Sequence, residues 1–194
     1  MSIEVEGVSK YYGDQAALDK VNFSLGKGEI VGFLGPNGAG KSTMMKIISC
    51  YLPPSEGTVK VAGYDIFDHS IKVRKKVGYL PETNPLYPEM YIREYLRFVA
   101  GIYKLKNKSN LIEEMIETVG LQREAHKKIG QISKGYKQRV GLAQALIHNP
   151  DVLILDEPTS GLDPNQLEDI RGLIRKIGSE KTVLLSTHIM QEVE

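Results

Sequence analysis

The chain has 194 residues, of which 41% are hydrophobic and 25% are charged, and its net charge is +1. This length and composition predict one compact globular domain of residues 1–194. The near-neutral charge argues against a nucleic-acid binder that works through a strong basic field. No stretch approaches the ~20 apolar residues that a membrane-spanning helix requires.

The ends of the chain and its single cysteine indicate a compartment. The first residues, MSIEVEGVSK, lack the charged and then apolar pattern of a secretory signal, so we expect the protein to stay in the cytoplasm. Cys50 has no partner for an internal disulfide, which agrees with a reducing environment. The last residues, HIMQEVE, have the pattern of a helix that is just beginning, which predicts a sequence truncated at its C-terminus.

The expected strands fall into two classes. Residues 21–25 and 58–63 alternate apolar and polar side chains, as half-exposed antiparallel strands do. Residues 29–35, 151–157 and 182–188 are short apolar runs bounded by turn residues, which is typical of parallel strands buried on both faces.

Helical periodicity dominates the middle of the chain and returns near its end. A helical block is expected over 82–148, inserted between the parts of an α/β core formed by 1–81 and 149–194. Asp163 and Pro164 form a favourable N-cap and first-turn pair for a later helix. The apolar positions expected in the core are Ile92, Tyr95, Leu96, Val99 and Ile102, then Leu111, Ile112, Met115, Ile116 and Val119, then Leu167, Ile170, Leu173, Ile174 and Ile177.

The segment GPNGAGKST, residues 35–43, follows a predicted strand and opens a predicted helix. It fits the G-x-x-x-x-G-K-[ST] pattern, whose glycines let successive backbone N–H groups cradle phosphate oxygens. Lys41 is placed to reach the β- and γ-phosphates, and the Ser42 hydroxyl to bind Mg²⁺. A glycine-rich turn before a helix is the structural alternative. The residues expected to bind a nucleoside triphosphate are Gly35, Pro36, Asn37, Gly38, Ala39, Gly40, Lys41, Ser42 and Thr43.

Two carboxylates, Asp156 and Glu157, end the apolar run VLILDE. Ligands of open α/β sheets bind beyond the carboxyl ends of the strands, so Asp156 is expected to hold Mg²⁺ and Glu157 to act as general base toward the attacking water. A turn that simply ends a strand is the alternative. His188 ends the next run, LLSTH, where it is placed to contact a γ-phosphate or the water, although a histidine that only completes a strand end fits equally well.

The segment QISKGYKQRV, residues 131–140, predicts a helix capped by Ser133. Gly135 then falls in the first turn, where alanine is more stable by about 1 kcal/mol. One explanation is that another group has to approach the backbone closely at this position.

The order of the phosphate loop, SKGYKQR, LILDEPTSGLD and STH resembles the ATP-binding subunits of ABC transporters, over essentially the whole chain. The resemblance implies a P-loop NTPase fold with a RecA-like parallel-sheet core, an N-terminal antiparallel β portion and an inserted helical subdomain. It also implies that two subunits pack head to tail, and that Ser133, Lys134 and Gly135 of one chain face the ATP of the other. Gly135 is then expected to be bare so that the partner's phosphate can approach.

Other positions follow from the same resemblance. Tyr12 matches the aromatic residue that stacks on adenine, although the adjacent Tyr11 is an alternative. Asp163 matches a loop that crosses the dimer interface, and Glu82 stands where the family usually has a Gln that touches Mg²⁺. The commoner family signature is L-S-G-G-Q, from which Ile132, Lys134 and Tyr136 depart, while Ser133 and Gly135 are retained.

The segments GYLPETNPLYPEMYIREYLRF and ISKGYKQRVGLAQALI are most similar to the exporter branch in which ATPase and membrane subunits are separate chains, including gliding-motility-associated and multidrug export ATPases. The loop 84–90 is expected to face the membrane subunit, with Leu86 and Tyr87 as apolar plugs. A proline-rich turn that buries its own aromatic residues is the alternative.

The resemblance therefore implies an ATPase that uses ATP and Mg²⁺, closes as a homodimer, and powers export through an integral membrane permease at the cytoplasmic face of the membrane. A soluble ABC-type ATPase acting on ribosomes or DNA is the second hypothesis, disfavoured by the single ATPase unit and the near-neutral charge. A GTP switch is excluded, since NKSN, residues 107–110, lacks the Asp of the base-reading motif.

Overall fold

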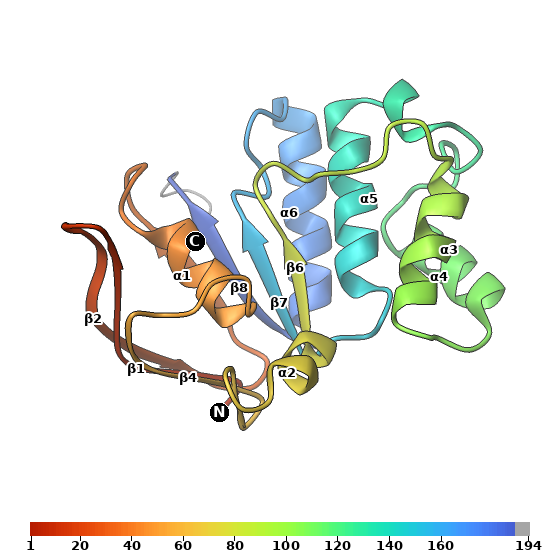
Figure 1. The fold of residues 1–194 in the computed structure, drawn as a ribbon. Coiled ribbons are helices and arrows are strands. Elements are labelled where there is room, and N and C mark those ends of the chain that lie inside the picture. The colour runs from red at the N-terminus through yellow and green to blue at the C-terminus, as the bar shows by residue number, and fades with distance from the viewer. Residues whose placement is uncertain (189–194) are drawn as a thin grey trace.

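The computed structural model describes residues 1–188, so the helix expected to begin in the last residues lies outside the described part. Two four-stranded sheets form the framework (Figure 1). The antiparallel sheet consists, in spatial order, of β2 (Gln15–Leu25), β1 (Ile3–Tyr12), β4 (Glu56–Val61) and β5 (Tyr64–Asp65). The parallel sheet consists, in spatial order, of β3 (Ile30–Leu34), β8 (Thr182–Thr187), β7 (Val152–Asp156) and β6 (Val77–Leu80).

The helices pack mainly on the parallel sheet. In Figure 1, α1 lies between the two sheets, while α5 and α6 cover the opposite face of the parallel sheet and α3 and α4 pack beyond α5. The helices are α1 (Lys41–Ile48), α2 (Ser70–Lys76), α3 (Ile92–Ile102), α4 (Lys108–Thr118), α5 (Lys134–Leu146) and α6 (Pro164–Gly178), with one 3₁₀ turn, η1 (Ile129–Gln131). Within residues 1–188, no helix is long and apolar enough to cross a membrane.

Alternate residues of the central strands enter two separate cores. On β7, Ile154 faces the core that contains α1 and the antiparallel sheet, and Leu153 and Leu155 face the core formed with the other helices. On β8, Leu184 and Leu185 divide in the same way. A strand with apolar side chains on both faces is stable only where both faces are covered. The continuous apolar runs of the sequence therefore reflect this burial between two helical layers.

The predicted strands 151–157 and 182–188 are confirmed as the buried strands β7 and β8. The run 29–35 does form β3, but burial of β3 on both faces is wrong: Ile30 and Leu34 are 45% and 47% exposed, because β3 is an edge strand with a neighbour on one side only. Residues 21–25 are the end of the longer strand β2, and 58–63 overlap β4.

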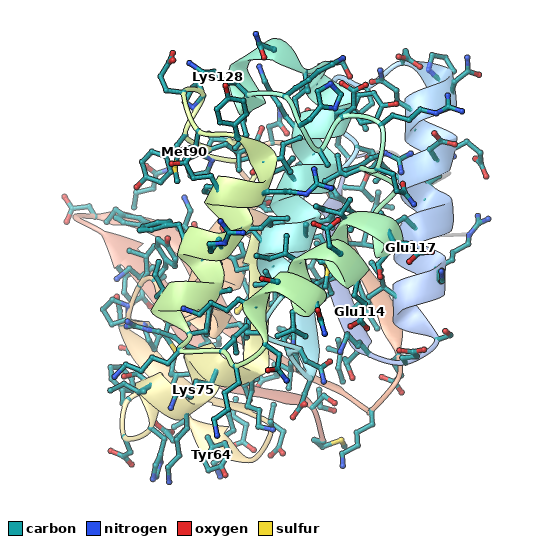
Figure 2. All side chains as sticks on the ribbon, turned by 90° about the vertical axis from the view of Figure 1, so that its right-hand side faces the viewer. Tyr64, Lys75, Met90, Glu114, Glu117 and Lys128 are labelled. Carbon is teal, nitrogen blue, oxygen red and sulfur yellow. The ribbon has the colours of Figure 1, made fainter. Side chains whose placement is uncertain are left out.

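Most of the predicted apolar stripes pack in the core. Ile92, Leu96, Ile112 and Ile116 are fully buried, and the outward face of α4 carries polar residues, including Glu114 and Glu117 (Figure 2). Ile102 is an exception, since it is 63% exposed. It is the last residue of α3, where the chain turns away, and it borders an open cavity instead of the core.

Candidate functional site

The loop between β3 and α1 has the backbone shape that its glycines predict. Gly38 and Gly40 have φ angles of 84° and 83°, in the left-handed region that favours glycine. A Cβ on Gly40 would lie 2.5 Å from the carbonyl oxygen of Ala17 on β2, so a larger residue is excluded there by contact as well. The first N–H groups of α1 have no intrahelical partners, which leaves them free to donate hydrogen bonds to an anion at the helix end.

Lys41, the first residue of α1, links this loop to the acidic pair. Its Nζ donates to the carbonyl oxygens of Gly35 and Pro36 at 2.6 and 3.0 Å, and lies 3.7 Å from Glu157 Oε1. The Lys41 side chain is only 9% exposed. A single ammonium group therefore lies between the phosphate loop and the end of β7, at the point where phosphate oxygens would need a cation.

Asp156, the last residue of β7, is held by two hydroxyl groups. Its Oδ1 accepts hydrogen bonds from Ser42 Oγ at 3.0 Å and from Ser186 Oγ at 2.7 Å. Ser186 Oγ in turn accepts a hydrogen bond from the backbone N–H of Glu157 at 2.9 Å. The buried Ser186 was not identified from the sequence. Its signal was present, because it immediately precedes the ThrHis pair at the end of a buried strand.

Glu157 follows in a strained backbone position. Its φ of 49° is left-handed, which costs a residue with a side chain about 1–2 kcal/mol. One carboxylate oxygen, Oε2, is 2.9 Å from His188 Nδ1, whereas the buried Oε1 has no hydrogen-bond partner among the described residues. The second oxygen is therefore available to accept a proton from a water molecule, as the predicted general base requires.

Ser42 and Asp156 supply the kind of oxygen ligands that Mg²⁺ prefers. The part of the chain that the structure describes contains no cluster of three His, Cys, Asp or Glu side chains suited to a metal. Mg²⁺ typically keeps several waters and binds through one or two carboxylates together with substrate phosphates, and this donor set fits such binding.

Glu82 is not brought into this cluster. It lies exposed in the turn after β6 and forms no hydrogen bond with Ser42 or Asp156 in the described structure. Glu82 and Asp156 nevertheless share one neighbour, Tyr79. Burial raises the pKa of the Tyr79 phenol, and both carboxylates raise it further. The expected contact between Glu82 and Mg²⁺ thus remains a prediction that requires movement of this turn.

The hairpin of β1 and β2 lies beside the phosphate loop. Ala17 and Leu18 of β2 approach Gly40, and the hairpin places Tyr12 opposite Gln15 near its turn. Tyr12 is 51% exposed, with Lys10 Nζ 5.5 Å from the centre of its ring. An exposed ring at this place can stack on a nucleotide base. The adjacent Tyr11 is also exposed, so both residues stay candidates.

The N-terminus of α5 forms as predicted, and in this structure a side chain of the same chain covers Gly135. Ser133 caps the helix by accepting a hydrogen bond from the Tyr136 N–H at 3.4 Å, and it is exposed. Gly135 is buried by its own chain: a Cβ there would lie 2.7 Å from Oε1 of Gln166. Lys134 likewise folds back toward Gly161. The close approach inferred from the sequence is real, but in this structure a side chain of α6 makes it.

Asp163 is the N-cap residue of α6. Its Oδ1 accepts hydrogen bonds from the N–H groups of Asn165 and Gln166 at 3.1 and 3.0 Å, which caps α6 as the sequence predicts. Because Gln166 lies in the first turn of α6, this cap also fixes the position from which its side chain reaches Gly135.

The chain is similar to known proteins in sequence and in fold. The family model described as ABC transporter matches residues 18–160, and a model described as AAA domain, putative AbiEii toxin, Type IV TA system matches residues 128–194. The chain is 39% identical over 194 residues to the bacitracin transport ATP-binding protein BcrA of Bacillus licheniformis, covering 99% of this chain and 63% of the relative. It is 40% identical over 198 residues to the probable multidrug ABC transporter ATP-binding protein YbhF of Escherichia coli, covering 99% and 34%.

Solved structures agree with the sequence relatives. A bacterial ABC transporter cassette solved as a dimer matches with a TM-score of 0.88 and 32% identity, covering 98% of this chain and 90% of the other. A dimeric post-hydrolysis state of that cassette, bound to ADP and Pi, matches with a TM-score of 0.87 and 31% identity, at the same coverage. The chain therefore belongs to the ABC transporter family, as an ATP-binding domain.

Proposed function

We propose that the protein hydrolyses ATP to ADP and phosphate and uses the resulting opening and closing of a homodimer to drive export through a separate membrane permease. The observation that carries the proposal is the cluster at the end of β7. A lysine, two hydroxyl groups, a buried aspartate and a glutamate meet there beside the loop expected to bind phosphate. One oxygen of that glutamate lies near the lysine but has no hydrogen-bond partner among the described residues.

The roles of the side chains follow from their chemistry. Lys41 exchanges its carbonyl partners for β- and γ-phosphate oxygens, and the loop N–H groups bind the remaining charge. Ser42 and Asp156 are the residues that hold Mg²⁺, which neutralises charge on the phosphates when it is bound. Glu157 Oε1 takes the proton of the attacking water, while the hydrogen bond to His188 keeps the carboxylate oriented.

The second half of each site comes from the partner subunit. Ser133 and the N-terminus of α5 supply a hydroxyl group and the positive end of a helix dipole to the γ-phosphate held by the other chain. The solved neighbours named above are dimeric, which supports this assembly. In the closing step the Gln166 side chain leaves Gly135, so that the glycine N–H becomes accessible to phosphate.

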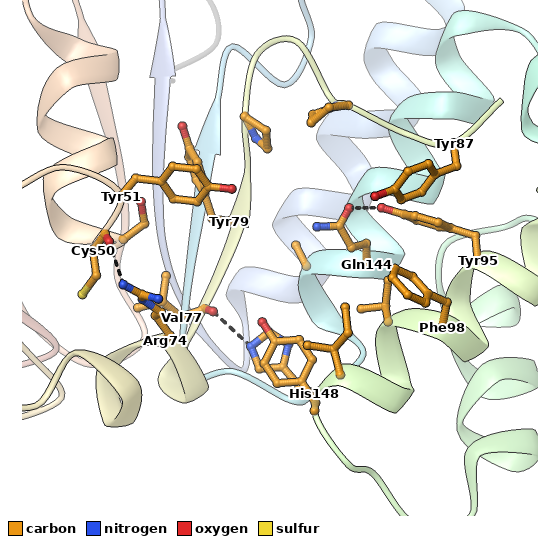
Figure 3. A pocket seen from close by; sticks show the side chains of 17 residues that line it. Cys50, Tyr51, Arg74, Val77, Tyr79, Tyr87, Tyr95, Phe98, Gln144 and His148 are labelled. Carbon is orange, nitrogen blue, oxygen red and sulfur yellow. Dashed lines mark hydrogen bonds between the residues drawn. The ribbon is translucent and has the colours of Figure 1, made fainter.

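An open cavity of about 610 Å³ supports a permease-docking role for the loop 84–90 (Figure 3). Tyr87 of this loop is 55% exposed and contacts the ring of Phe98, and both border the cavity together with the exposed Ile102. Leu86 is partly buried and packs against the protein's own core, so Tyr87 is the more exposed of the two expected apolar plugs. We assign the cavity to an apolar segment of the membrane permease and propose that the subunit lies on the cytoplasmic face of the membrane.

Affinity capture of the full-length protein from detergent-solubilised membranes tests the assignment. The expected result is a multi-span membrane protein in equal amount, lost in a Tyr87→Asp variant and retained in the matched Tyr91→Asp variant, since the exposed Tyr91 lies outside the cavity. Ribosomal or DNA-bound partners without a membrane chain would leave the ATPase chemistry standing and contradict the role in export.

A further inference from the structure

Gln138 bridges two segments that the sequence does not connect. It lies in α5, only 7% of its surface is exposed, and its Nε2 donates a hydrogen bond of 2.8 Å to the carbonyl oxygen of Pro158. Pro158 directly follows Glu157, so this bond holds the peptide next to the general base. Hydrogen bonds therefore flank Glu157: its own N–H donates to Ser186, and the carbonyl of the next residue, Pro158, accepts from Gln138.

Asn84 binds the oxygen of the Gln138 side-chain amide. Its Nδ2 donates to the carbonyl oxygen of Lys137 at 2.9 Å and to Gln138 Oε1 at 3.3 Å. Asn84 has a left-handed φ of 42° and packs on Gly141, where a Cβ would lie 2.5 Å from its Oδ1. A larger residue at Gly141 would push the Asn84 side chain away, so the small residue in the middle of α5 permits this contact.

The two hydrogen bonds form a continuous path. It runs from Asn84, which begins the loop 84–90, through Gln138 to Pro158 and Glu157. The next residue of the loop, Pro85, borders the cavity together with Tyr87. A shift of this loop would strain the hydrogen bonds of the buried Gln138 amide to Asn84 and Pro158. The strained backbone of Glu157 is the part of the path that can respond, because a left-handed residue is held in place by its surroundings.

We propose that Gln138 is a positioning residue for Glu157, and that Asn84 couples its position to the loop at the cavity mouth. The coupling to a docked partner rests on the permease role proposed above, whereas the positioning of Glu157 does not. A displacement of the base on the order of 1 Å can reduce turnover by about 10²-fold. The path therefore gives a docked segment a direct physical means of setting the hydrolysis rate.

The first test is Gln138→Met in the full-length protein, which keeps the length of the side chain and removes both hydrogen bonds. We expect kcat for ATP hydrolysis to fall roughly tenfold or more while KM for ATP changes little, because the phosphate loop is untouched. Gln131→Met is the matched control: the Gln131 side chain is also hydrogen-bonded to the backbone, where its Oε1 accepts from Lys128 N–H at 3.1 Å, but it lies outside the path. An unchanged kcat in Gln138→Met would overturn the proposal.

A double-mutant cycle identifies the path itself. Asn84→Ala should lower kcat in the same direction but less, and adding it to Gln138→Met should change little further, since both act through the same amide. Fully additive effects would show that the two residues act independently and would contradict the coupling. If Gln138→Met does not fold, the Asn84→Ala variant alone tests the proposal. A reduced kcat at constant KM would support it, and an unchanged kcat would contradict it.

A readout without ATP separates this proposal from the proposed function. Hydrogen exchange at the Glu157 amide reports how firmly its bond to Ser186 is held, whether or not a preparation hydrolyses ATP. Faster exchange at this amide is expected in Gln138→Met, and the parent rate is expected in Gln131→Met. Parent-like exchange in both variants would exclude the positioning role even if the protein proves to be an active ATPase.

Discussion

The two regions assigned to ATP differ in how complete they are. At the edge of the parallel sheet, Asp156 already accepts hydrogen bonds from Ser42 and Ser186, and Lys41 lies 3.7 Å from Glu157. The glycines of the loop between β3 and α1 already have their left-handed backbone angles. At the N-terminus of α5, Gly135 is covered by a side chain of the same subunit. In the first region, the side chains and the loop are already arranged within one subunit. In the second region, a side chain of the same subunit covers the backbone of Gly135.

The difference follows from what each region binds in the proposed mechanism. A site that takes the nucleotide first has to be formed in the single subunit, since binding energy would otherwise be spent on ordering it. A site that meets phosphate only after two subunits close can keep a weak internal contact that gives way on closure. The contact of the flexible Gln166 side chain with Gly135 is of this kind.

Glu157→Gln tests the first region and should have the largest effect. The amide cannot take a proton from water, so we expect the rate of ATP hydrolysis to fall by about 10²–10⁴-fold with ATP affinity retained. Turnover by phosphate release and nucleotide binding by calorimetry measure the two separately. Turnover close to that of the parent protein would show that another residue is the general base. It would contradict the role assigned to the first region.

Gly135→Ala, alone and combined with Gln166→Ala, tests the second region. The added methyl group meets Gln166 in the free subunit. In the proposed closed dimer it would obstruct the partner's phosphate. We expect a loss of turnover on the order of tenfold that Gln166→Ala does not restore, measured with thermal stability as the folding control. Restored turnover in the double variant would mean that Gly135 serves only the packing of α5 on α6.

The Glu82→Gln variant tests whether the exposed turn after β6 moves to the first region during ATP hydrolysis. If Glu82 contacts Mg²⁺, loss of its charge should raise the Mg²⁺ concentration needed for half-maximal hydrolysis severalfold. A titration of turnover against Mg²⁺ at fixed ATP measures this directly. An unchanged Mg²⁺ dependence and activity would show that the position is not a metal contact.

His148, just past the opposite end of α5, should give the smallest effect. Burial, assisted by the Lys181 ammonium, lowers the pKa of His148 against the raising effect of its bond to the Val77 carbonyl. The unfolded chain thus binds more protons, so the free energy of unfolding should fall as pH drops below about 6.5.

The matched variant for this effect is His148→Phe, which keeps a ring to stack on Tyr103. It should cost about 1 kcal/mol at pH 7.5 through the lost hydrogen bond. It should also flatten the dependence of stability on pH, as measured by denaturant unfolding from pH 7.5 to 5.5. An equally steep dependence in both proteins would assign the titration to another group.

The sequence correctly predicted those features that depend on local residue patterns. The ends of β7 and β8, the cap of α6 at Asp163 and the phosphate loop all follow from short-range rules about apolar runs, capping and glycine. It missed the first half of β2 and the short basic helix α2, whose residues lack a clear apolar stripe. It also could not predict that Gln166 covers Gly135, because the contact joins residues 31 positions apart through the packing of α5 on α6.

The candidate site shows the same limit. Asp156, Glu157 and His188 were selected because they end neighbouring strands, which places them at one edge. Ser186, Gln138 and Asn84 are ordinary polar residues in the sequence, and only the folded chain shows that their hydrogen bonds converge on the base. Ile102 had the right spacing for the core, but it is the last residue of α3 and borders the open cavity.

Sedimentation of the full-length Glu157→Gln variant with and without saturating ATP tests the central claim most directly. The account predicts monomers without nucleotide and a stable dimer with ATP, because binding is retained while the hydrolysis that reopens the dimer is blocked. Adding Ser133→Ala and Gly135→Ala to that variant should weaken the dimer without reducing ATP binding. Monomers at saturating ATP in the Glu157→Gln variant would contradict the claim that the two regions meet across a nucleotide.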